Sequence, residues 1–255
     1  MGEVYRKGPI ELRLGDYRDV LADVEPDAVI TDPPYSERTH AGMKMNAASG
    51  SVGGVFGRGG VVYDSWSAGD IERLVSSFSQ VRWIVAMTDD VMCHEYREAA
   101  RSAGRYAFPP LPFVELGKQP RLGGDGPAGW TCWIMPSRIS SAQMLGWGSL
   151  PGAYVTSTAE KRAIKGGKPI ALMRALVRDY SRPGDLVCDP CAGGATTLIA
   201  AALEGRRAIG AELDPKTFAL ACARIERTAL TAPLPGMEPR RKVEQGALAL
   251  DEAAS

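Results

Sequence analysis

The stretch from Leu186 to Glu212 constrains the fold of this chain more than any other part of the sequence. An apolar run at Leu186–Cys188 predicts a buried strand, and a glycine-rich turn leads from it into a predicted helix at Leu198–Glu204. A second apolar run at Ala208–Glu212 predicts another strand. Two strands joined through a helix lie parallel, because the crossover returns the chain to the edge where it started. The stretch therefore predicts an α/β fold with the turn at residues 189–197 on the carboxyl edge of a parallel sheet.

The same alternation of strands and helices continues along most of the chain. We expect one doubly wound α/β domain over residues 1–230, with helices on both faces of a mostly parallel sheet, and a flexible tail over residues 231–255. The other strands are expected at residues 10–14, 28–31, 83–87, 113–116 and 131–135, and the other helices at residues 17–21, 70–78, 91–103, 170–180 and 215–227.

Composition narrows the class of protein. A chain of 255 residues with 45% hydrophobic residues can bury a substantial core. No apolar run reaches the roughly 18 residues of a membrane helix, and the first residues lack the apolar core of a signal peptide. We therefore expect a cytoplasmic protein with no membrane partner. The 30 basic and 30 acidic residues cancel, so any contact with nucleic acid must use a local basic patch.

The five cysteines give little support for a metal or disulfide site. Cys188 and Cys191 have the spacing of a zinc knuckle or redox pair, but no second pair follows and the chain has only two histidines. Cys188 also ends an apolar run, where cysteine usually acts as a small buried hydrophobic residue. We expect no metal.

Two segments interrupt the alternation. Residues 36–63 contain seven glycines and no acid between Glu37 and Asp64, which favours a mobile lid over an ordinary connection. Residues 136–167 are expected to be irregular. Both segments carry basic side chains that can contact a substrate, and the alternative is that they are solvated loops. Their candidate substrate-binding residues are Arg38, Lys44, Arg58 and Arg138.

A second turn complements the glycine-rich one. Asp32, Pro33, Pro34 and Tyr35 follow the apolar run Ala28–Ile30, so a rigid corner with a carboxylate, a carbonyl and an aromatic ring ends a buried strand. Taken alone, this corner is an ordinary strand-terminating turn. Parallel topology places it at the same edge as residues 189–197, where it can act on a bound ligand.

The glycine-rich turn favours a cofactor that contains adenosine. Gly193 and Gly194 allow a ligand to approach the backbone, and Glu212 at the tip of the next strand can bind ribose hydroxyls. The turn is not a G-x-G-x-x-G fingerprint and carries no Walker lysine. A cofactor without a pyrophosphate therefore fits better.

The two turns together resemble the motifs of S-adenosylmethionine-dependent DNA amino-methyltransferases. Asp189–Thr197 is similar to the family motif D-P-F-x-G-S-G-T-T, and Asp32–Tyr35 to the catalytic motif. The catalytic motif comes first, and Lys168-Pro169 precedes the cofactor motif, which is the order of the beta group. The resemblance implies a Rossmann-like sheet with permuted motifs, S-adenosyl-L-methionine as cofactor, S-adenosyl-L-homocysteine as product and double-stranded DNA as substrate. It also implies that residues 136–167 contain the target-recognition region.

The resemblance assigns roles residue by residue. The implied catalytic residues are Asp32, Pro33, Pro34 and Tyr35, with Tyr35 also stacking on the target base. The implied cofactor contacts are Asp16, Asp32, Lys168, Asp189, Pro190, Cys191, Ala192, Gly193, Gly194, Thr196, Glu212 and Leu213. Cys191 departs from the usual Phe and Gly194 from the common Ser, and residues 160–167 depart from the family's H-P-T-Q form, which affects the cofactor pocket more than the reaction class.

The identity of the methylated group is inferred from Asp32. Asp-Pro-Pro-Tyr favours the N6 amine of adenine, whereas cytosine-N4 enzymes more often carry Ser-Pro-Pro-Tyr. Enzymes that methylate RNA or protein amides more often carry Asn-Pro-Pro-Tyr. A non-catalytic DNA-binding relative is the remaining alternative, against which the intact Asp32, Tyr35, Gly193 and Glu212 argue. A bacterial or phage restriction-modification context and a homodimer are both compatible with this group.

Overall fold

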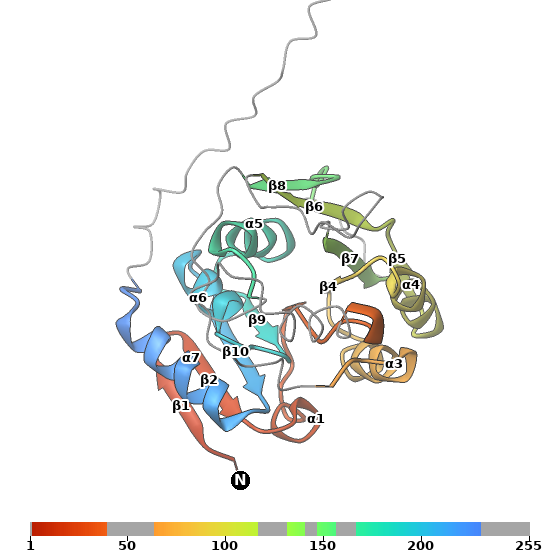
Figure 1. The fold of residues 1–255 in the computed structure, drawn as a ribbon. Coiled ribbons are helices and arrows are strands. Elements are labelled where there is room, and N and C mark those ends of the chain that lie inside the picture. The colour runs from red at the N-terminus through yellow and green to blue at the C-terminus, as the bar shows by residue number, and fades with distance from the viewer. Residues whose placement is uncertain (1, 40–63, 117–131, 141–146, 157–166, 231–255) are drawn as a thin grey trace, which may run out of the picture.

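One ten-stranded sheet with helices on both faces forms the fold (Figure 1). The computed structural model describes residues 2–39, 64–116, 132–140, 147–156 and 167–230. The strands are β1 Val4–Lys7, β2 Ile10–Leu14, β3 Ala28–Thr31, β4 Trp83–Thr88, β5 Arg105–Ala107, β6 Leu111–Glu115, β7 Cys132–Ile139, β8 Tyr154–Thr156, β9 Leu186–Asp189 and β10 Arg207–Glu212. The helices are α1 Tyr17–Val20, α3 Ala68–Ser77, α4 Cys93–Ser102, α5 Ile170–Tyr180, α6 Thr196–Leu203 and α7 Pro215–Arg227.

The strand order confirms the predicted doubly wound, mostly parallel fold. The order is β1-β2-β10-β9-β3-β4-β7-β6-β8, and β5 pairs with β7 outside this path. The five strands from β2 to β4 are parallel to their neighbours, whereas β7 is antiparallel to β4 and β1 to β2. Five parallel strands bring five carboxyl ends to one edge of the sheet, which is the edge that the sequence assigns to ligands.

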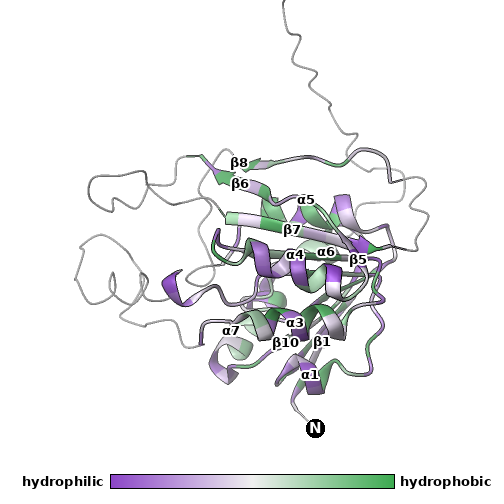
Figure 2. Ribbon diagram, turned by 90° about the vertical axis from the view of Figure 1, so that its right-hand side faces the viewer, coloured by the Kyte–Doolittle hydropathy of each residue, from purple (hydrophilic) through white to green (hydrophobic). Residues whose placement is uncertain are grey.

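Two hydrophobic layers hold the sheet between its helices. Side chains of α5, α6 and α7 pack on one face, where Leu176 and Leu198 are fully buried. Side chains of α3 and α4 pack on the other face, where Ile71 and Leu74 are fully buried. Figure 2 shows hydrophobic residues concentrated on the strands and hydrophilic ones on outer turns and helix surfaces. Truncating one such side chain, as in Leu198→Ala, should destabilise the fold by about 2–5 kcal/mol.

The carboxyl half of β7 corrects the expectation that residues 136–167 are irregular. β7 continues through Pro136 to Ile139, and its residues 133–138 pair with β4. We expected a strand end because proline cannot donate to a ladder. Pro136 is tolerated because it lies between the part of β7 that pairs with β6, residues 132–134, and the part that pairs with β5, residues 137–139. The three-residue strands β5 and β8 and the edge strand β1 were not predicted from the sequence.

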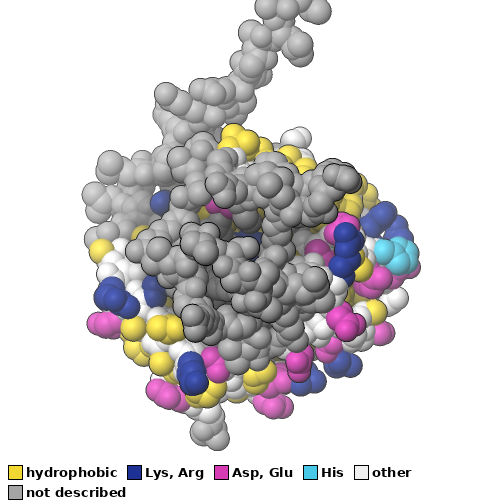
Figure 3. Space-filling view, in the orientation of Figure 1, with side chains coloured by type: hydrophobic (Ala, Val, Ile, Leu, Met, Phe, Trp, Pro, Cys, Tyr) yellow, Lys and Arg dark blue, Asp and Glu magenta, His cyan; other side chains and the backbone are white. Residues whose placement is uncertain are grey.

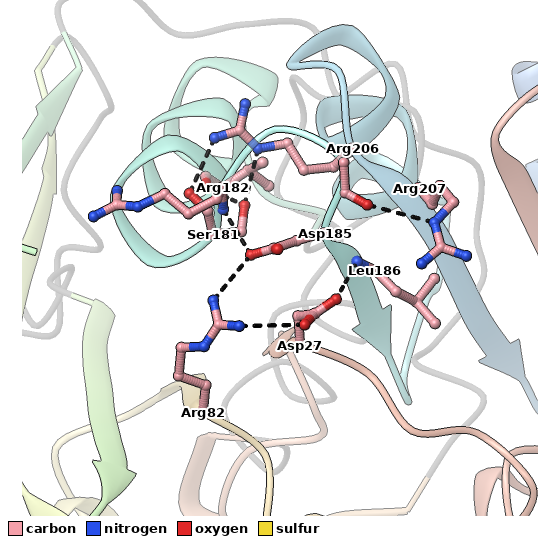
Figure 4. A network of polar contacts seen from close by, with 10 residues as sticks. Asp27, Arg82, Ser181, Arg182, Asp185, Leu186, Arg206 and Arg207 are labelled. Carbon is pink, nitrogen blue, oxygen red and sulfur yellow. Dashed lines mark hydrogen bonds and ion pairs between the residues drawn. The ribbon is translucent and has the colours of Figure 1, made fainter. Parts of the chain in front are cut away.

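The amino edge of the sheet is closed by a polar network (Figure 4). Arg82, which precedes β4, lies 3.3 Å from the carboxylates of both Asp27 and Asp185, which precede β3 and β9. Asp27 also accepts the main-chain N–H of Leu186 at 2.8 Å, and Asp185 accepts that of Arg182 at 2.7 Å. These carboxylates therefore tie together the turns that enter three neighbouring strands.

Within the described residues, no helix combines the length and the apolar character needed to cross a membrane.

Candidate active site

The candidate site lies at the point of the sheet where the strand order reverses, between β3 and β9. β3 and β9 are neighbours, and the chain continues from β3 to β4 on one side and from β9 to β10 on the other. Open α/β sheets bind ligands at such a switch point. Asp32 follows β3 and Asp189 ends β9, so both carboxylates lie there. The Thr31 hydroxyl joins the two turns by donating to Asp189 at 2.7 Å.

Lys168 binds the carboxylate of Asp32. Its Nζ lies 2.7 and 2.6 Å from the two Oδ atoms, and the Tyr35 hydroxyl donates to Oδ1 at 2.9 Å. The side chains of Lys168 and Asp32 are only 11% and 23% exposed, so water screens this ion pair less than a surface pair. Pro33 is buried and Pro34 half-buried, and their fixed φ angles keep the corner rigid.

Tyr35 is fixed at its ring face, its hydroxyl and its backbone. Nζ of Lys168 lies 4.9 Å from the ring centroid, within the range of a cation–π contact. The hydroxyl also contacts Sγ of Cys132 at 3.1 Å, and the Tyr35 carbonyl accepts the Trp66 N–H at 3.1 Å. Burial raises the pKa of Tyr35 well above its usual value of 10. The phenol therefore stays protonated and can donate to Asp32.

Asp189 is the most deeply buried acid of the site. It is 2% exposed and accepts the main-chain N–H of Cys191 at 3.1 Å. Burial raises the pKa of Asp189 from 3.8 to about 6, although hydrogen bonds from Thr197 and Thr31 act in the opposite direction. The carboxylate thus organises the turn from inside and does not face solvent.

The glycine-rich turn has an unusual backbone. Gly193 has φ +50° and Ala195, a residue with a Cβ, has φ +59° at the N-cap of α6. A left-handed non-glycine residue is strained and often marks a functional turn. On β10, a Cβ added to Gly210 would lie 3.0 Å from both Ala192 Cβ and the Asp189 carbonyl oxygen. Gly210 therefore lets the turn pack closely on the next strand.

Glu212 closes the cofactor side of the site. Its carboxylate accepts the N–H groups of Gly193 at 2.8 Å and Asp214 at 2.9 Å. Burial raises the pKa of Glu212 above its usual value of 4.5. A carboxylate has about four lone-pair positions, so Glu212 can also accept hydroxyl donors. The neighbouring Leu213 is 66% exposed and can offer apolar surface beside it.

Asp16 lies at the next strand end of the same edge. β2 pairs with β10 so that Leu14 is opposite Glu212, and the Gly15 N–H donates to the Glu212 carbonyl at 2.9 Å. The Asp16 carboxylate accepts the N–H and the Nε of Arg18, both at 2.9 Å, and caps α1. The structure thus brings Asp16 to the same edge of the sheet as Glu212.

Three residues of the predicted cofactor motif serve the turn itself. Pro190 and Gly194 are buried. The Arg224 guanidinium donates to the Gly194 carbonyl at 2.6 Å and to the Thr196 hydroxyl at 2.7 Å, which anchors the turn to α7. The hydroxyl of Thr196 is therefore already engaged within the protein.

Sequence reasoning missed two polar groups beside Asp32. Cys132 contacts Tyr35 from β7, whose antiparallel pairing with β4 cannot be read from the sequence. Asp89 is buried and accepts hydrogen bonds from Ser36 N at 3.1 Å and Thr39 Oγ1 at 2.6 Å. Asp89 could have been found, because it follows a buried strand at the same carboxyl edge as Asp32 and Glu212.

These contacts also change where the expected lid begins. Ser36 is 6% exposed and Thr39 half-buried, so the first residues after the corner are anchored to Asp89. The remainder of the expected lid, with Lys44 and Arg58, lies outside the described residues.

The structure does not bring Arg138 to this site. Arg138 pairs with Trp83 at the amino end of β4, whereas Met135 is the residue at the level of Thr31. Three residues along a strand span about 10 Å, so Arg138 lies toward the opposite edge of the sheet. Its guanidinium lies 5.2 Å from the Tyr106 ring centroid. We therefore no longer treat Arg138 as a substrate contact.

Arg38 lies at the surface near the corner. Its side chain is 74% exposed and lies 3.4 Å from Asp90. In the view of Figure 3, basic and acidic side chains of the described residues are interspersed around the rim. This part of the surface thus carries both positive and negative charges.

In the described part of the chain no cluster of metal-ligating side chains is present, and Cys188 and Cys191 are free thiols.

Sequence comparison points to one protein family. A family model described as DNA methylase, of the N6/N4 type, matches residues 146–222, which include Lys168 and the whole glycine-rich turn up to Glu212. Over this segment, about a third of its length, the chain is similar to N6/N4 DNA methylases.

Two curated methyltransferases share a short segment with this chain. The Type II methyltransferase M.MthZI of Methanothermobacter thermautotrophicus is 47% identical over 60 residues, which are 24% of this chain and 17% of the relative. The DNA adenine methyltransferase YhdJ of Escherichia coli strain K12 is 37% identical over 59 residues, 23% of this chain and 20% of the relative. The chain thus aligns with about a fifth of the length of these relatives.

Solved structures share the fold over most of the chain. The M1.HpyAVI–SAM complex has a TM-score of 0.62 at 19% identity, covering 85% of this chain and 98% of that one. The cytosine-N4-specific PvuII DNA methyltransferase has a TM-score of 0.61 at 14% identity, covering 89% of this chain and 90% of that one. Because these sequence identities are low, the structural similarity shows the α/β methyltransferase fold and nothing further about this chain.

Proposed function

We propose that this chain transfers a methyl group from S-adenosyl-L-methionine to the exocyclic N6 amine of adenine in double-stranded DNA, with the target base turned out of the helix. One observation supports this proposal above the others. A rigid carboxylate corner, Asp32–Tyr35, lies at the switch point of the sheet and is hydrogen-bonded through Thr31 to the glycine-rich turn. An acceptor for an amine and a turn suited to an adenosine-type cofactor thus share one edge.

The residues present fit the proposed cofactor. The turn offers close backbone approach at Gly193, and the buried Glu212 can accept ribose hydroxyls. When bound, S-adenosyl-L-methionine supplies an electrophilic methyl group on a sulfonium. Asp16 at the neighbouring strand end is the proposed contact for the adenine, and the exposed Leu213 is proposed to cover one of its faces.

Asp32 is proposed to bind and orient the target amine. The lone pair of an exocyclic amine is delocalised into the ring, which makes the amine a weak nucleophile. Hydrogen bonds from the amine to Asp32 and to the Pro33 carbonyl would favour a pyramidal nitrogen and aim its lone pair. Lys168 and Tyr35 occupy about three of the four acceptor positions of the Asp32 carboxylate, which leaves one for the amine.

Tyr35 is proposed to stack on the turned-out base. Lys168 covers one face of the ring, so the base would use the other face. Transfer breaks the sulfonium–carbon bond and forms the nitrogen–carbon bond, and the amine then loses a proton. Asp32 lies within hydrogen-bonding reach of that proton in this arrangement.

Cytosine N4 is the second candidate. It is favoured by the structural match to a cytosine-N4-specific enzyme, whereas one relative by sequence is described as a DNA adenine methyltransferase. Asp32 in place of serine favours adenine. Methylation of RNA or of a protein amide is a weaker candidate on the same ground. Recognition of the DNA around the target is proposed for residues 36–63 and for the part of residues 136–167 that follows β7. A homodimer is compatible with the proposal.

The test is product identification. The protein is incubated with methyl-labelled S-adenosyl-L-methionine and duplex DNA of mixed sequence, and the DNA is digested to nucleosides. We expect labelled N6-methyladenosine in its deoxy form. If the label is found in N4-methylcytosine, the target base is cytosine and the second candidate is correct. If the label is found only in added RNA or protein, DNA is rejected as the substrate.

A further inference from the structure

The contact between Cys132 and Tyr35 joins two distant parts of the chain. Cys132 opens β7, the strand that runs antiparallel to β4, and its Sγ lies 3.1 Å from the Tyr35 hydroxyl oxygen although the residues are 97 positions apart. Among the described residues, the Trp133 carbonyl lies 3.8 Å from this sulfur, a longer contact, and the backbone of Thr88 also hydrogen-bonds to it. The thiol therefore has Tyr35 as a closer hydrogen-bonding partner than the Trp133 carbonyl.

Counting protons assigns the direction of this hydrogen bond. The Tyr35 hydroxyl carries one proton, and the carboxylate of Asp32, 2.9 Å away, can only accept. Tyr35 therefore donates to Asp32, and its oxygen accepts the thiol proton of Cys132. Burial raises the pKa of the Cys132 thiol, so it keeps the proton that this arrangement needs. The result is a chain of hydrogen bonds from thiol to phenol to carboxylate.

We infer that Cys132 is a positioning residue for the proposed methyl transfer, which orients the Tyr35 ring and through it the acceptor oxygen of Asp32. Without the thiol, Asp32 is the remaining hydrogen-bonding partner of the Tyr35 hydroxyl among the described residues, so the position of this hydroxyl is less well defined. Lys168 still binds both Asp32 oxygens, but the hydrogen bond that orients Oδ1 from the side of Tyr35 is weakened. Small losses of orientation at a reacting centre lower kcat far more than substrate affinity.

This inference rests on the proposed function and predicts a specific coupling. The proteins compared are the wild type, Cys132→Ala, Tyr35→Phe and the double variant, each assayed for methyl transfer to duplex DNA. A net hydrogen bond contributes about 0.5–1.5 kcal/mol, so Cys132→Ala should lower kcat about 2- to 12-fold with little change in KM for S-adenosyl-L-methionine. In the Tyr35→Phe background, the same substitution should change kcat less than 2-fold.

A merely structural role would give a different result. If Cys132→Ala lowers kcat by the same factor with and without the Tyr35 hydroxyl, the thiol does not act through Tyr35 and the inference is wrong. Cys132→Ser should retain most of the rate, because a hydroxyl can donate in the same place. Cys222→Ala removes another half-buried thiol, from α7, and serves as the matched control with an unchanged rate.

A second pair of variants keeps the test decisive if Cys132→Ala does not fold. Cys132→Thr and Cys132→Val have the same shape, suit a β-strand and differ in one hydroxyl. The valine variant should be slower than the threonine variant, and equal rates would overturn the inference.

Failure of the proposed function can be told apart from failure of this inference. If the wild type labels no nucleic acid, the proposed function fails. The hydrogen bond is then tested by thermal unfolding of the same four proteins, where the decrease in Tm of the double variant should be smaller than the sum of the two single decreases. Additive decreases in Tm would contradict the contact itself.

Discussion

At the amino edge of the sheet Arg82 is shared between Asp27 and Asp185, whereas at the carboxyl edge Lys168 binds the single carboxylate of Asp32. The distances differ as well: 3.3 Å for both contacts of Arg82, and 2.6 and 2.7 Å for those of Lys168. The Arg82 side chain is 35% exposed and that of Lys168 only 11%. Similar residue types thus occupy different environments at the two ends of the same strands.

The difference separates structural acids from candidate functional ones. Acids at both edges accept main-chain N–H groups, but Asp27 and Asp185 also share the guanidinium of Arg82, which ties their turns together. At the carboxyl edge, burial raises the pKa of Asp189 and of Glu212, which opposes ionisation of the folded protein. Perturbed acids gathered in one place are typical of functional sites. The amino edge therefore fits a structural role, and the carboxyl edge fits the proposed methyl transfer.

The largest effect on activity among the supporting residues is expected for Lys168→Met. Removing the cation leaves a poorly exposed Asp32 carboxylate with no positive charge beside it and only the Tyr35 hydrogen bond, among those described, to orient its oxygens. We expect kcat for methyl transfer to fall about 100-fold. Lys216→Met, which removes an exposed lysine from α7, is the control and should keep the wild-type rate. Equal rates for both variants would remove Lys168 from the site.

Asp189→Asn should change the pH dependence of stability. The folded pKa of Asp189 is raised from 3.8 to about 6, so the folded protein binds this proton more tightly than the unfolded chain. The resulting stabilisation is fully present below pH 3.8 and is lost as the pH rises through about 6; it corresponds to about 3 kcal/mol. Urea unfolding between pH 4 and 8 should show this component in the wild type and not in Asp189→Asn. Parallel curves for the two proteins would contradict it.

The smallest effect is expected at the amino edge, for Arg82→Met. Its two ion pairs are partly exposed and 3.3 Å long, so screening by water limits their contribution to about 1 kcal/mol. The variant should lose that much stability in urea unfolding and keep the wild-type kcat. A decrease in kcat of more than about 3-fold would contradict the assignment of a purely structural role to Arg82.

Much of this site could be predicted because it depends on the ends of parallel strands. Asp32 and Asp189 are 157 residues apart, yet two apolar runs that each end in an acid are enough to place them at one edge. The pairing of β3 with β9 confirms the fold on which that inference depends. Roles for the individual residues stay predictions until activity is measured.

The parts that could not be predicted depend on antiparallel or short strands. Cys132 reaches Tyr35 because β7 turns back beside β4, and no local pattern reveals that register. Arg138 was misplaced for the same reason, because Pro136 is the middle of a strand and not its end. β5 and β8 have three residues each, too few for an alternation to be read.

The central claim is that the Asp32 carboxylate orients an amine for methyl transfer, and Asp32→Asn tests it most directly. Asparagine keeps the shape and one acceptor but removes the negative charge. The measurement is the single-turnover rate of methyl transfer to duplex DNA at saturating S-adenosyl-L-methionine, together with the Kd for the cofactor. We expect the rate to fall at least about 1000-fold while the Kd changes by less than about 10-fold. A variant with a rate near that of the wild type would contradict the account.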